Sequence, residues 1–320
     1  MTRRALVTGG QGFVAQWAIR AMLERGWSVT AAGIGSTTES PALDAGRRAQ
    51  VTWAELDVTR QSQVAEVLER AAPDMVLHLA AVSHVLDARR DPAQAFEVNA
   101  VGTVRLLAEV ARLRAASQCD PIVLVVGSAE QYGRHDEREL PLAEDAPQRP
   151  LTHYAASKAS QEVAALQVWR SEGVRILCTR TFSHSGVGQP PQFLLPALVA
   201  RAVALPPSGG RLAIGNAGTV RDFLHVTDVV EAYLALLELG VAGEVYNVSS
   251  GEGISVRRLA ESVLQRVGVP AEISTDPALS RPVDVPAQIG SNAKLRGATG
   301  WNPRHTREDI IDDLIHAATR

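Results

Sequence analysis

The sequence predicts an α/β protein built on a doubly wound parallel sheet, with a smaller, partly discontinuous lobe in its C-terminal half. Three observations support this prediction. Short apolar runs alternate with helical patterns from Ala5 onward, a glycine-rich turn follows the first apolar run, and the alternation breaks after Thr181. Alternating strands and helices favour a parallel sheet with right-handed crossovers and with helices on both faces.

The elements of the first half follow one another in a regular order. Short apolar runs predict strands, and these are expected at 5–7, 28–32, 75–78, 122–126 and 175–179, with a further strand before Asp57. Apolar residues at helical spacing predict helices, and these are expected at 14–24, 63–70, 95–114 and 154–171.

The second half is looser, because Pro190-Pro191, Pro206-Pro207 and Gly209-Gly210 interrupt it. A helix at 226–239 and a strand at 244–248 then resume the doubly wound pattern. We therefore expect one domain from residues 1–182 plus about 220–248, and a smaller lobe from 183–219 and 249–320. Two such lobes commonly bind a ligand in the cleft between them.

Composition argues against several classes of function. The 320 residues carry a net charge of −3 without basic runs, which gives no support for binding nucleic acid. No stretch approaches the ~20 apolar residues of a membrane span, and Gly9 and Gly10 interrupt the first apolar run, unlike a signal peptide. Cys119 and Cys178 lie far apart without metal-ligand spacing, which favours a reduced cytoplasm and no bound metal.

The glycine-rich turn joins the first strand to the first helix. Gly9 permits the tight turn, Gly12 lets the backbone approach a pyrophosphate at the helix N-terminus, and Ala15 allows close packing of helix and strand. The spacing is Gly-x-x-Gly-x-x-Ala, and its place in the first strand–helix unit makes it persuasive. It predicts a Rossmann-type dinucleotide site that includes Gly9, Gly12, Phe13 and Val14.

The end of the second strand bears on the choice of cofactor. A carboxylate there would bind the ribose 2′-hydroxyl of NAD, whereas small polar groups with an Arg suit the 2′-phosphate of NADP. The chain has no carboxylate at this place, Glu39 comes late, and Ser36 is placed to bind a phosphate. We therefore expect NADP(H) in preference to NAD(H), with a plain polar turn as the alternative. Asp57 and Val58, after the third strand, are placed at the adenine edge or in an ordinary turn.

Tyr154 and Lys158 lie four residues apart in a predicted helix and therefore point from one face of it. A lysine ammonium beside a phenol favours the phenolate, so that the tyrosine exchanges a proton nearer neutral pH than its usual pKa of about 10. The same spacing arises by chance on solvated helices. The dinucleotide loop upstream is the reason to interpret Tyr154 and Lys158 as a catalytic pair.

With these features the chain resembles the extended short-chain dehydrogenase/reductase family, also called the NAD-dependent epimerase/dehydratase family, over essentially all of its length. The stretches that carry the resemblance are 8–13, Asp57-Val58, 78–81, 99–103, Gly127-Ser128, Tyr154 with Lys158, and 180–182.

The resemblance implies hydride transfer between a nicotinamide cofactor and a sugar carbon. Tyr154 would donate the proton, Lys158 would lower its pKa and bind the nicotinamide ribose, and Ser128 would orient the carbonyl group. Glu130 would be an acid or base at a sugar carbon, or merely a strand-end carboxylate. Further implied cofactor contacts are Leu79, Ala80, Ala81, Asn99 and Thr181. Implied substrate contacts are Ser83, Ser128, Glu130, Ser183, and the two diphosphate-binding arginines Arg221 and Arg281.

Within the family, the stretches 180–189, 215–223 and 281–303 most resemble the GDP-4-dehydro-6-deoxy-D-mannose reductases, which make GDP-D-rhamnose. The chain departs from their pattern at Ser183, Val187 and His225, where Asn, Pro and Asp are usual. The implied activity is reduction of the 4-keto group of a GDP-sugar. The alternatives are a GDP-mannose-type 4,6-dehydratase, a 4-epimerase that recycles its cofactor, and a redox sensor that binds the dinucleotide without catalysis.

The 95–114 and 154–171 helices carry more apolar residues than one buried face needs. In the family, two such helices from each subunit form a four-helix interface. The resemblance therefore implies a homodimer.

Overall fold

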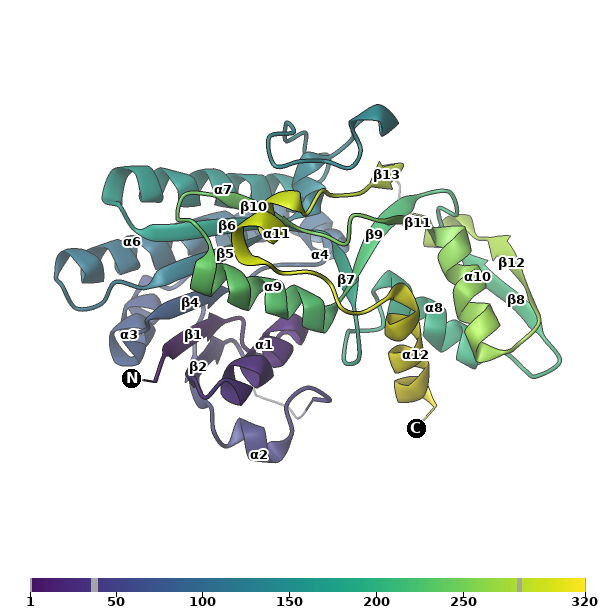
Figure 1. Cartoon of the computed structure of the whole chain (residues 1–320), viewed down its shortest axis with the longest axis horizontal. Helices are drawn as coiled ribbons and strands as arrows, with labels where there is room; N and C mark the ends of the chain where they lie inside the picture. Colours follow the sequence, from purple (N-terminus) through teal and green to yellow (C-terminus); the bar gives the residue numbers. More distant parts are fainter. Residues whose placement is uncertain (1, 36–39, 281–283, 320) are drawn as a thin grey trace.

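The computed structural model describes residues 2–35, 40–280 and 284–319. Its largest layer is a seven-stranded parallel sheet in the order β10-β6-β5-β4-β1-β2-β3 (Figure 1). Its strands are β1 (Arg4–Thr8), β2 (Ser28–Gly33), β3 (Thr52–Glu55), β4 (Met75–His78), β5 (Ile122–Ser128), β6 (Arg175–Thr181) and β10 (Val245–Val248). The predicted doubly wound sheet is confirmed.

Helices cover both faces of this sheet. One face carries α1 (Phe13–Glu24), α9 (Val226–Leu239) and α11 (Ala293–Thr299), and the other carries α3 (Gln61–Ala71), α6 (Gly102–Ala115) and α7 (His153–Glu172). Successive strand residues point to opposite faces. Val7 and Leu77 therefore belong to the first core, whereas Leu6 and Val76 belong to the second, and all four are fully buried. Burial on both sides explains why the central strands read as continuous apolar runs.

The predicted helix at 95–114 is interrupted by a π-helical turn. The chain runs from α5 (Pro92–Phe96) through the turn Glu97–Val101 into α6. Asn99 lies in this turn, and its side-chain amide accepts from the backbone N–H of Val82 at 2.8 Å and donates to the Ser157 hydroxyl at 2.9 Å. The π-helical turn thus positions Asn99 to join the loop after β4 to α7.

A smaller group of elements lies beside the carboxyl edge of the large sheet (Figure 1). The strands β7 (Ser183–Ser185), β11 (Gly253–Ser255) and β13 (Ala287–Gln288) pair with β9 (Val220–His225), and β8 (Gly210–Ile214) pairs with β12 (Ala271–Thr275). The helices α8 (Leu194–Val203), α10 (Val256–Val267) and α12 (Arg307–Ala318) share a separate apolar cluster. The division into two domains stays a prediction, and β9, which begins at residue 220, pairs within the smaller sheet.

The remaining short elements are α2 (Ala45–Arg48), α4 (Val85–Arg90) and 3-10 turns at Ala129–Tyr132, Glu137–Glu139 and Pro277–Leu279. Within the described ranges, no helix has the combined length and apolar character that crossing a bilayer would require. The same ranges contain no group of three or more His, Cys, Asp or Glu side chains that could hold a metal ion.

Candidate active site

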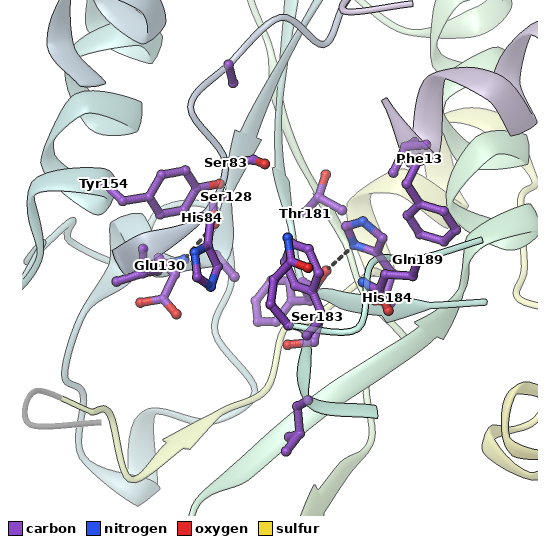
Figure 2. A pocket seen from close by; sticks show the side chains of 18 of the residues that line it. Phe13, Ser83, His84, Ser128, Glu130, Tyr154, Thr181, Ser183, His184 and Gln189 are labelled. Carbon is purple, nitrogen blue, oxygen red and sulfur yellow. Dashed lines mark hydrogen bonds between the residues drawn. The ribbon is translucent and has the colours of Figure 1, made fainter. Parts of the chain in front are cut away.

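A cleft of about 740 Å³ opens where the carboxyl ends of β1, β4, β5 and β6 meet the smaller group of elements around β9. In an open α/β sheet this edge, where neighbouring strands are connected in opposite directions, is the usual ligand site. The predicted site residues that line the cleft are Gly9, Gly12, Phe13, Val14, Leu79, Ala81, Ser83, Ser128, Glu130, Tyr154, Lys158, Thr181, Ser183 and Arg221. Figure 2 shows Ser128, Glu130 and Tyr154 on one side of the pocket, with Phe13 and His184 on the other.

Two predicted site residues, Ser36 and Arg281, fall outside the described residues. Among the described ones, Asp57, Val58, Ala80 and Asn99 do not line the cleft.

The side chains of Asp57, Val58 and Asn99 contact other parts of the fold. The Asp57 carboxylate accepts hydrogen bonds from the N–H and hydroxyl of Thr59 at 2.9 and 2.7 Å, just before α3. Val58 is buried against Gly102, where an added Cβ would lie 2.7 Å from its side chain. Asn99 is hydrogen-bonded to Val82 and Ser157 as described above, so its amide joins two segments of the fold.

The glycine-rich turn has the geometry of an anion cradle. Gly9 has a φ of +67°, and a Cβ there would lie 2.9 Å from the backbone nitrogen of Ala80. Gly12 is the N-cap of α1, which has neither a side-chain cap nor an acidic residue in its first turn. The backbone N–H groups at the start of a helix lack intrahelical partners, and the helix dipole favours negative charge there. Because this helix end lines the cleft, it fits the pyrophosphate of a dinucleotide.

Tyr154 lies in the first turn of α7 and close to Ser128 at the end of β5. Burial raises the pKa of Tyr154 to about 12, while a hydrogen bond from the Ser128 hydroxyl opposes the rise and the charge of Glu130 adds to it. Tyr154 therefore carries its proton at neutral pH.

Lys158 is buried and lines the cleft one helical turn further along α7. Its ammonium donates to the carbonyl oxygen of Val126 at 2.8 Å and to Gln161 Oε1 at 2.9 Å, and burial lowers its pKa to about 7. The sequence-based expectation that Lys158 lowers the pKa of Tyr154 differs from this arrangement, because burial dominates both groups and the ammonium is bonded to other partners.

A buried ion pair fixes the turn that carries Ser128. Glu162 of α7 accepts from Arg180 at 2.7 and 3.0 Å and from the side-chain amide of Gln131 at 2.9 Å. Gln131 in turn accepts from the backbone N–H of Ser128 at 2.8 Å. Sequence reasoning missed Glu162, although it lies four residues after Lys158 and so on the same face of the helix.

The remaining lining of the cleft comes from several separate segments. Arg221 pairs with Asp284 and donates to the Val285 carbonyl oxygen at 2.9 Å. The ring of His84 meets Phe193 edge-on at 5.7 Å. Lining residues that were not predicted as site residues include Gln94, Gln189, Phe193, Asn216 and Asp284. Only the fold brings these segments together.

Comparison with known proteins agrees with this geometry. The family model described as GDP-mannose 4,6 dehydratase matches residues 6–314. The chain is 36% identical to GDP-6-deoxy-D-mannose reductase of Pseudomonas aeruginosa (strain PAO1) over 98% of this chain and 97% of that protein.

Solved structures give the same relationship. The structure of RMD from Pseudomonas aeruginosa complexed with NADPH superposes with a TM-score of 0.81 at 32% identity, covering 99% of each chain. UDP-glucose 4-epimerase of Thermus thermophilus complexed with NAD gives a TM-score of 0.85 at 27% identity, also over 99% of each chain.

The parallel sheet, the glycine-rich turn and the group formed by Ser128, Tyr154 and Lys158 define an enzyme of the extended short-chain dehydrogenase/reductase class that uses a nicotinamide dinucleotide. Within that class, the chain belongs to the GDP-mannose 4,6-dehydratase family.

Proposed function

We propose that this enzyme reduces the 4-keto group of a nucleotide-activated 6-deoxyhexose, with GDP-4-dehydro-6-deoxy-D-mannose as substrate and GDP-D-rhamnose as product. The observation that carries the proposal is that Tyr154, Ser128 and the uncapped end of α1 line one cleft. The 36% identity to a GDP-6-deoxy-D-mannose reductase supports the choice of sugar nucleotide.

The cofactor would be held by the N-terminal turn of α1 at its pyrophosphate and by Lys158 at its nicotinamide ribose. When bound, it supplies the hydride. The Ser128 hydroxyl orients the sugar carbonyl by donating a hydrogen bond to its oxygen. Tyr154 gives its phenolic proton to that oxygen as negative charge develops there. Arg221 binds the diphosphate of the substrate through its guanidinium group.

Tyr154 is protonated at neutral pH, as the proton donor of a ketone reduction must be. Reduction needs a proton donor, and a phenol with a pKa of about 12 holds its proton at neutral pH. An epimerase or dehydratase begins instead by removing a hydride from the sugar, and this step needs a base that accepts the hydroxyl proton.

The test is single-turnover oxidation of NADPH followed at 340 nm with GDP-4-dehydro-6-deoxy-D-mannose. We expect turnover by the native enzyme, and its absence would overturn the proposal. Tyr154→Phe is expected to lower kcat by about 10²–10⁴ while the affinity for NADP⁺ stays within about twofold. Equal activity of this variant would overturn the role of Tyr154. A redox sensor would need none of the three cleft residues Ser128, Tyr154 and Lys158.

A 4,6-dehydratase is the second candidate, because Glu130 lines the cleft and its charge acts on Tyr154. A carboxylate at this place could move a proton at the sugar carbon next to the ketone. Incubation with GDP-mannose and catalytic NADP⁺, without added reductant, separates the two reactions. Formation of a 4-keto sugar would favour the dehydratase, and no product is expected for the reductase.

We propose NADP(H) as the preferred cofactor. β2 ends at Gly33, where a Cβ would lie 2.1 Å from Gln11 Oε1, and residues 28–35 contain no carboxylate to repel a 2′-phosphate. Calorimetric titration is expected to give tighter binding of NADP⁺ than of NAD⁺. The reverse order would contradict this preference.

We further propose a homodimer formed through α6 and α7. Val101 and Val104 on one side and Val163 on the other are apolar yet 37%, 42% and 66% exposed. Large apolar side chains on neighbouring exposed faces are typical of an interface. The enzyme is proposed to act in the cytoplasm, where its two free thiols, Cys119 and Cys178, would stay reduced.

A further inference from the structure

A buried chain of hydrogen bonds connects Lys158 to the strand that carries the glycine-rich turn. Lys158 Nζ donates to Gln161 Oε1 at 2.9 Å, and Gln161 Nε2 donates to the Thr103 hydroxyl at 2.9 Å. The ring of His78 bridges the Thr103 and Thr8 hydroxyls at 2.9 and 2.8 Å. These five residues come from α7, α6, β4 and β1, and each is at most 4% exposed.

The hydrogen-bond directions in this chain are determined from its Thr8 end. The Thr8 hydroxyl oxygen accepts from the backbone N–H groups of Leu79 and Ala80 at 3.2 Å, so its own proton goes to His78 Nδ1. The neutral imidazole then carries its proton on Nε2 and donates to Thr103. Burial, with a smaller contribution from the charge of Lys158, lowers the pKa of His78 to about 3, which keeps the ring neutral.

The amide of Gln161 has only one orientation compatible with these directions. The Thr103 hydroxyl donates to the Asn99 carbonyl oxygen at 2.7 Å, so its oxygen is left to accept from His78 and from Gln161. If the Gln161 amide were turned over, its N–H₂ would face the Lys158 ammonium, and two donors would meet without an acceptor.

We propose that Gln161 is a positioning residue for Lys158, held by Thr103 and His78 so that its amide oxygen always faces the ammonium. An ammonium group has three N–H donors. Gln161 and the Val126 carbonyl oxygen take two of them. The third stays available to the cleft, which Lys158 lines. Lys158, which lines the cleft, and the end of β1, which leads into the glycine-rich turn, are thereby held in one hydrogen-bonded unit.

Titratable groups approach Lys158 from several elements. His78 of β4 lies behind it, and Tyr154 of the same helix and Glu130 of the turn after β5 share the cleft with it. The nearest carboxylate along α7 is Glu162, whose oxygens bond Arg180, Gln131 and Gln148. Gln161 therefore supplies, with the Val126 carbonyl oxygen, the neutral acceptors that stabilise the charged form of Lys158.

The composition of the chain makes this proposal directly measurable. The 320 residues contain two lysines, Lys158 and Lys294. Labelling with [ε-¹³C]lysine therefore gives two side-chain signals, and Lys294→Arg leaves that of Lys158 alone. Titration of this signal with pH reports the pKa of Lys158 in the folded protein without any requirement for turnover.

Gln161→Leu is the first variant, since it keeps the volume and removes the acceptor. A hydrogen bond from a charged donor is strong enough that we expect the pKa of Lys158 to fall by about one to two pH units. Gln167→Leu, at an exposed site on the same helix, is the matched control and should leave the pKa of Lys158 unchanged. An unchanged pKa in Gln161→Leu would overturn the proposal.

Thr103 provides a second pair of variants should Gln161→Leu not fold. Thr103→Val removes the hydroxyl that orients the amide, so we expect a lowered pKa of Lys158, while Thr103→Ser keeps the hydroxyl and should restore the native value. Equal pKa values in these two variants would also overturn the proposal.

The effect on catalysis rests on the proposed function, and the two can fail separately. If the native enzyme does not turn over the keto sugar, the proposed function fails and the lysine titration still decides the role of Gln161. If the native enzyme turns over and Gln161→Leu leaves the lysine titration unchanged, only the positioning role fails.

Discussion

The buried ion pair between Glu162 and Arg180 offers a direct test of what holds the turn that carries Ser128. Both side chains are at most 6% exposed, and the two hydrogen bonds between them measure 2.7 and 3.0 Å. Glu162→Gln keeps the shape of the side chain and removes its charge. It leaves the Arg180 guanidinium, whose pKa is raised by this partner, without a counterion.

The expected loss of stability follows from this burial. Removing one partner of a buried pair costs about 3–5 kcal/mol, because the remaining charge cannot regain its hydration. The entropy of unfolding of 320 residues is about 0.7 kcal/mol/K near the melting temperature. Glu162→Gln should therefore lower Tm by about 4–7 °C.

Thermal unfolding followed by circular dichroism measures this change. The matched control is Glu272→Gln, which breaks the pair of Glu272 with Arg211, whose side chains are 70% and 76% exposed. An exposed pair contributes at most about 1 kcal/mol, or ~1.5 °C here. If Glu162→Gln melts no lower than Glu272→Gln, the buried charge pair is not what stabilises this region.

Three further predictions concern other parts of the molecule. Gly9→Ala should destabilise the fold by about 1–3 kcal/mol and weaken NADP⁺ binding, because φ of Gly9 is +67° and the added Cβ would lie 2.9 Å from the backbone nitrogen of Ala80. Urea unfolding and calorimetry measure the two effects. Gly218→Ala is the control, because the space around Gly218 is open. Burial raises the pKa of Asp222 to about 6, above its unfolded value of about 3.9, so the folded state keeps a proton that the unfolded chain releases. Stability from this group is full below pH 4 and falls by about 2–3 kcal/mol as pH rises to 6; Asp222→Asn should flatten that part of the urea-unfolding profile, and an identical slope would refute the assignment. Val163→Glu should give monomers in size-exclusion light scattering, whereas Leu239→Glu, equally apolar and 58% exposed on α9, should not; dimers in both would refute the α6–α7 interface.

Local patterns predicted much of the architecture. The strand at Met75–His78 and the helix at Val226–Leu239 have the predicted bounds, and the other elements of the first half differ by a few residues. Such segments are readable because the apolar spacing of a helix and the continuous apolar run of a buried strand are both patterns of neighbouring residues. The π-helical turn at Glu97–Val101 was not predicted, since it depends on the partners of Asn99 across the fold.

The residues of the candidate site also divide into those that local spacing predicted and those whose contacts depend on the fold. Gly9 and Gly12 lie in one turn, and Tyr154 and Lys158 lie on one helix face, so short spacings were sufficient to find them. Asp57 illustrates the limit of this reasoning, because a strand-end carboxylate faces a ligand or its own helix depending on its neighbours, and here it bonds Thr59.

The sequence by itself determined the class of fold, the glycine-rich turn and the groups that we propose exchange a proton, since these depend on residues close together in the chain. The tertiary structure decided how those groups are charged and held. Burial sets the pKa of Tyr154 and of Lys158 in opposite directions, and Gln161 and Glu162 acquire their roles from partners 18 to 58 residues away. Desolvation and long-range hydrogen bonds are properties of the packed molecule, and no local spacing encodes them.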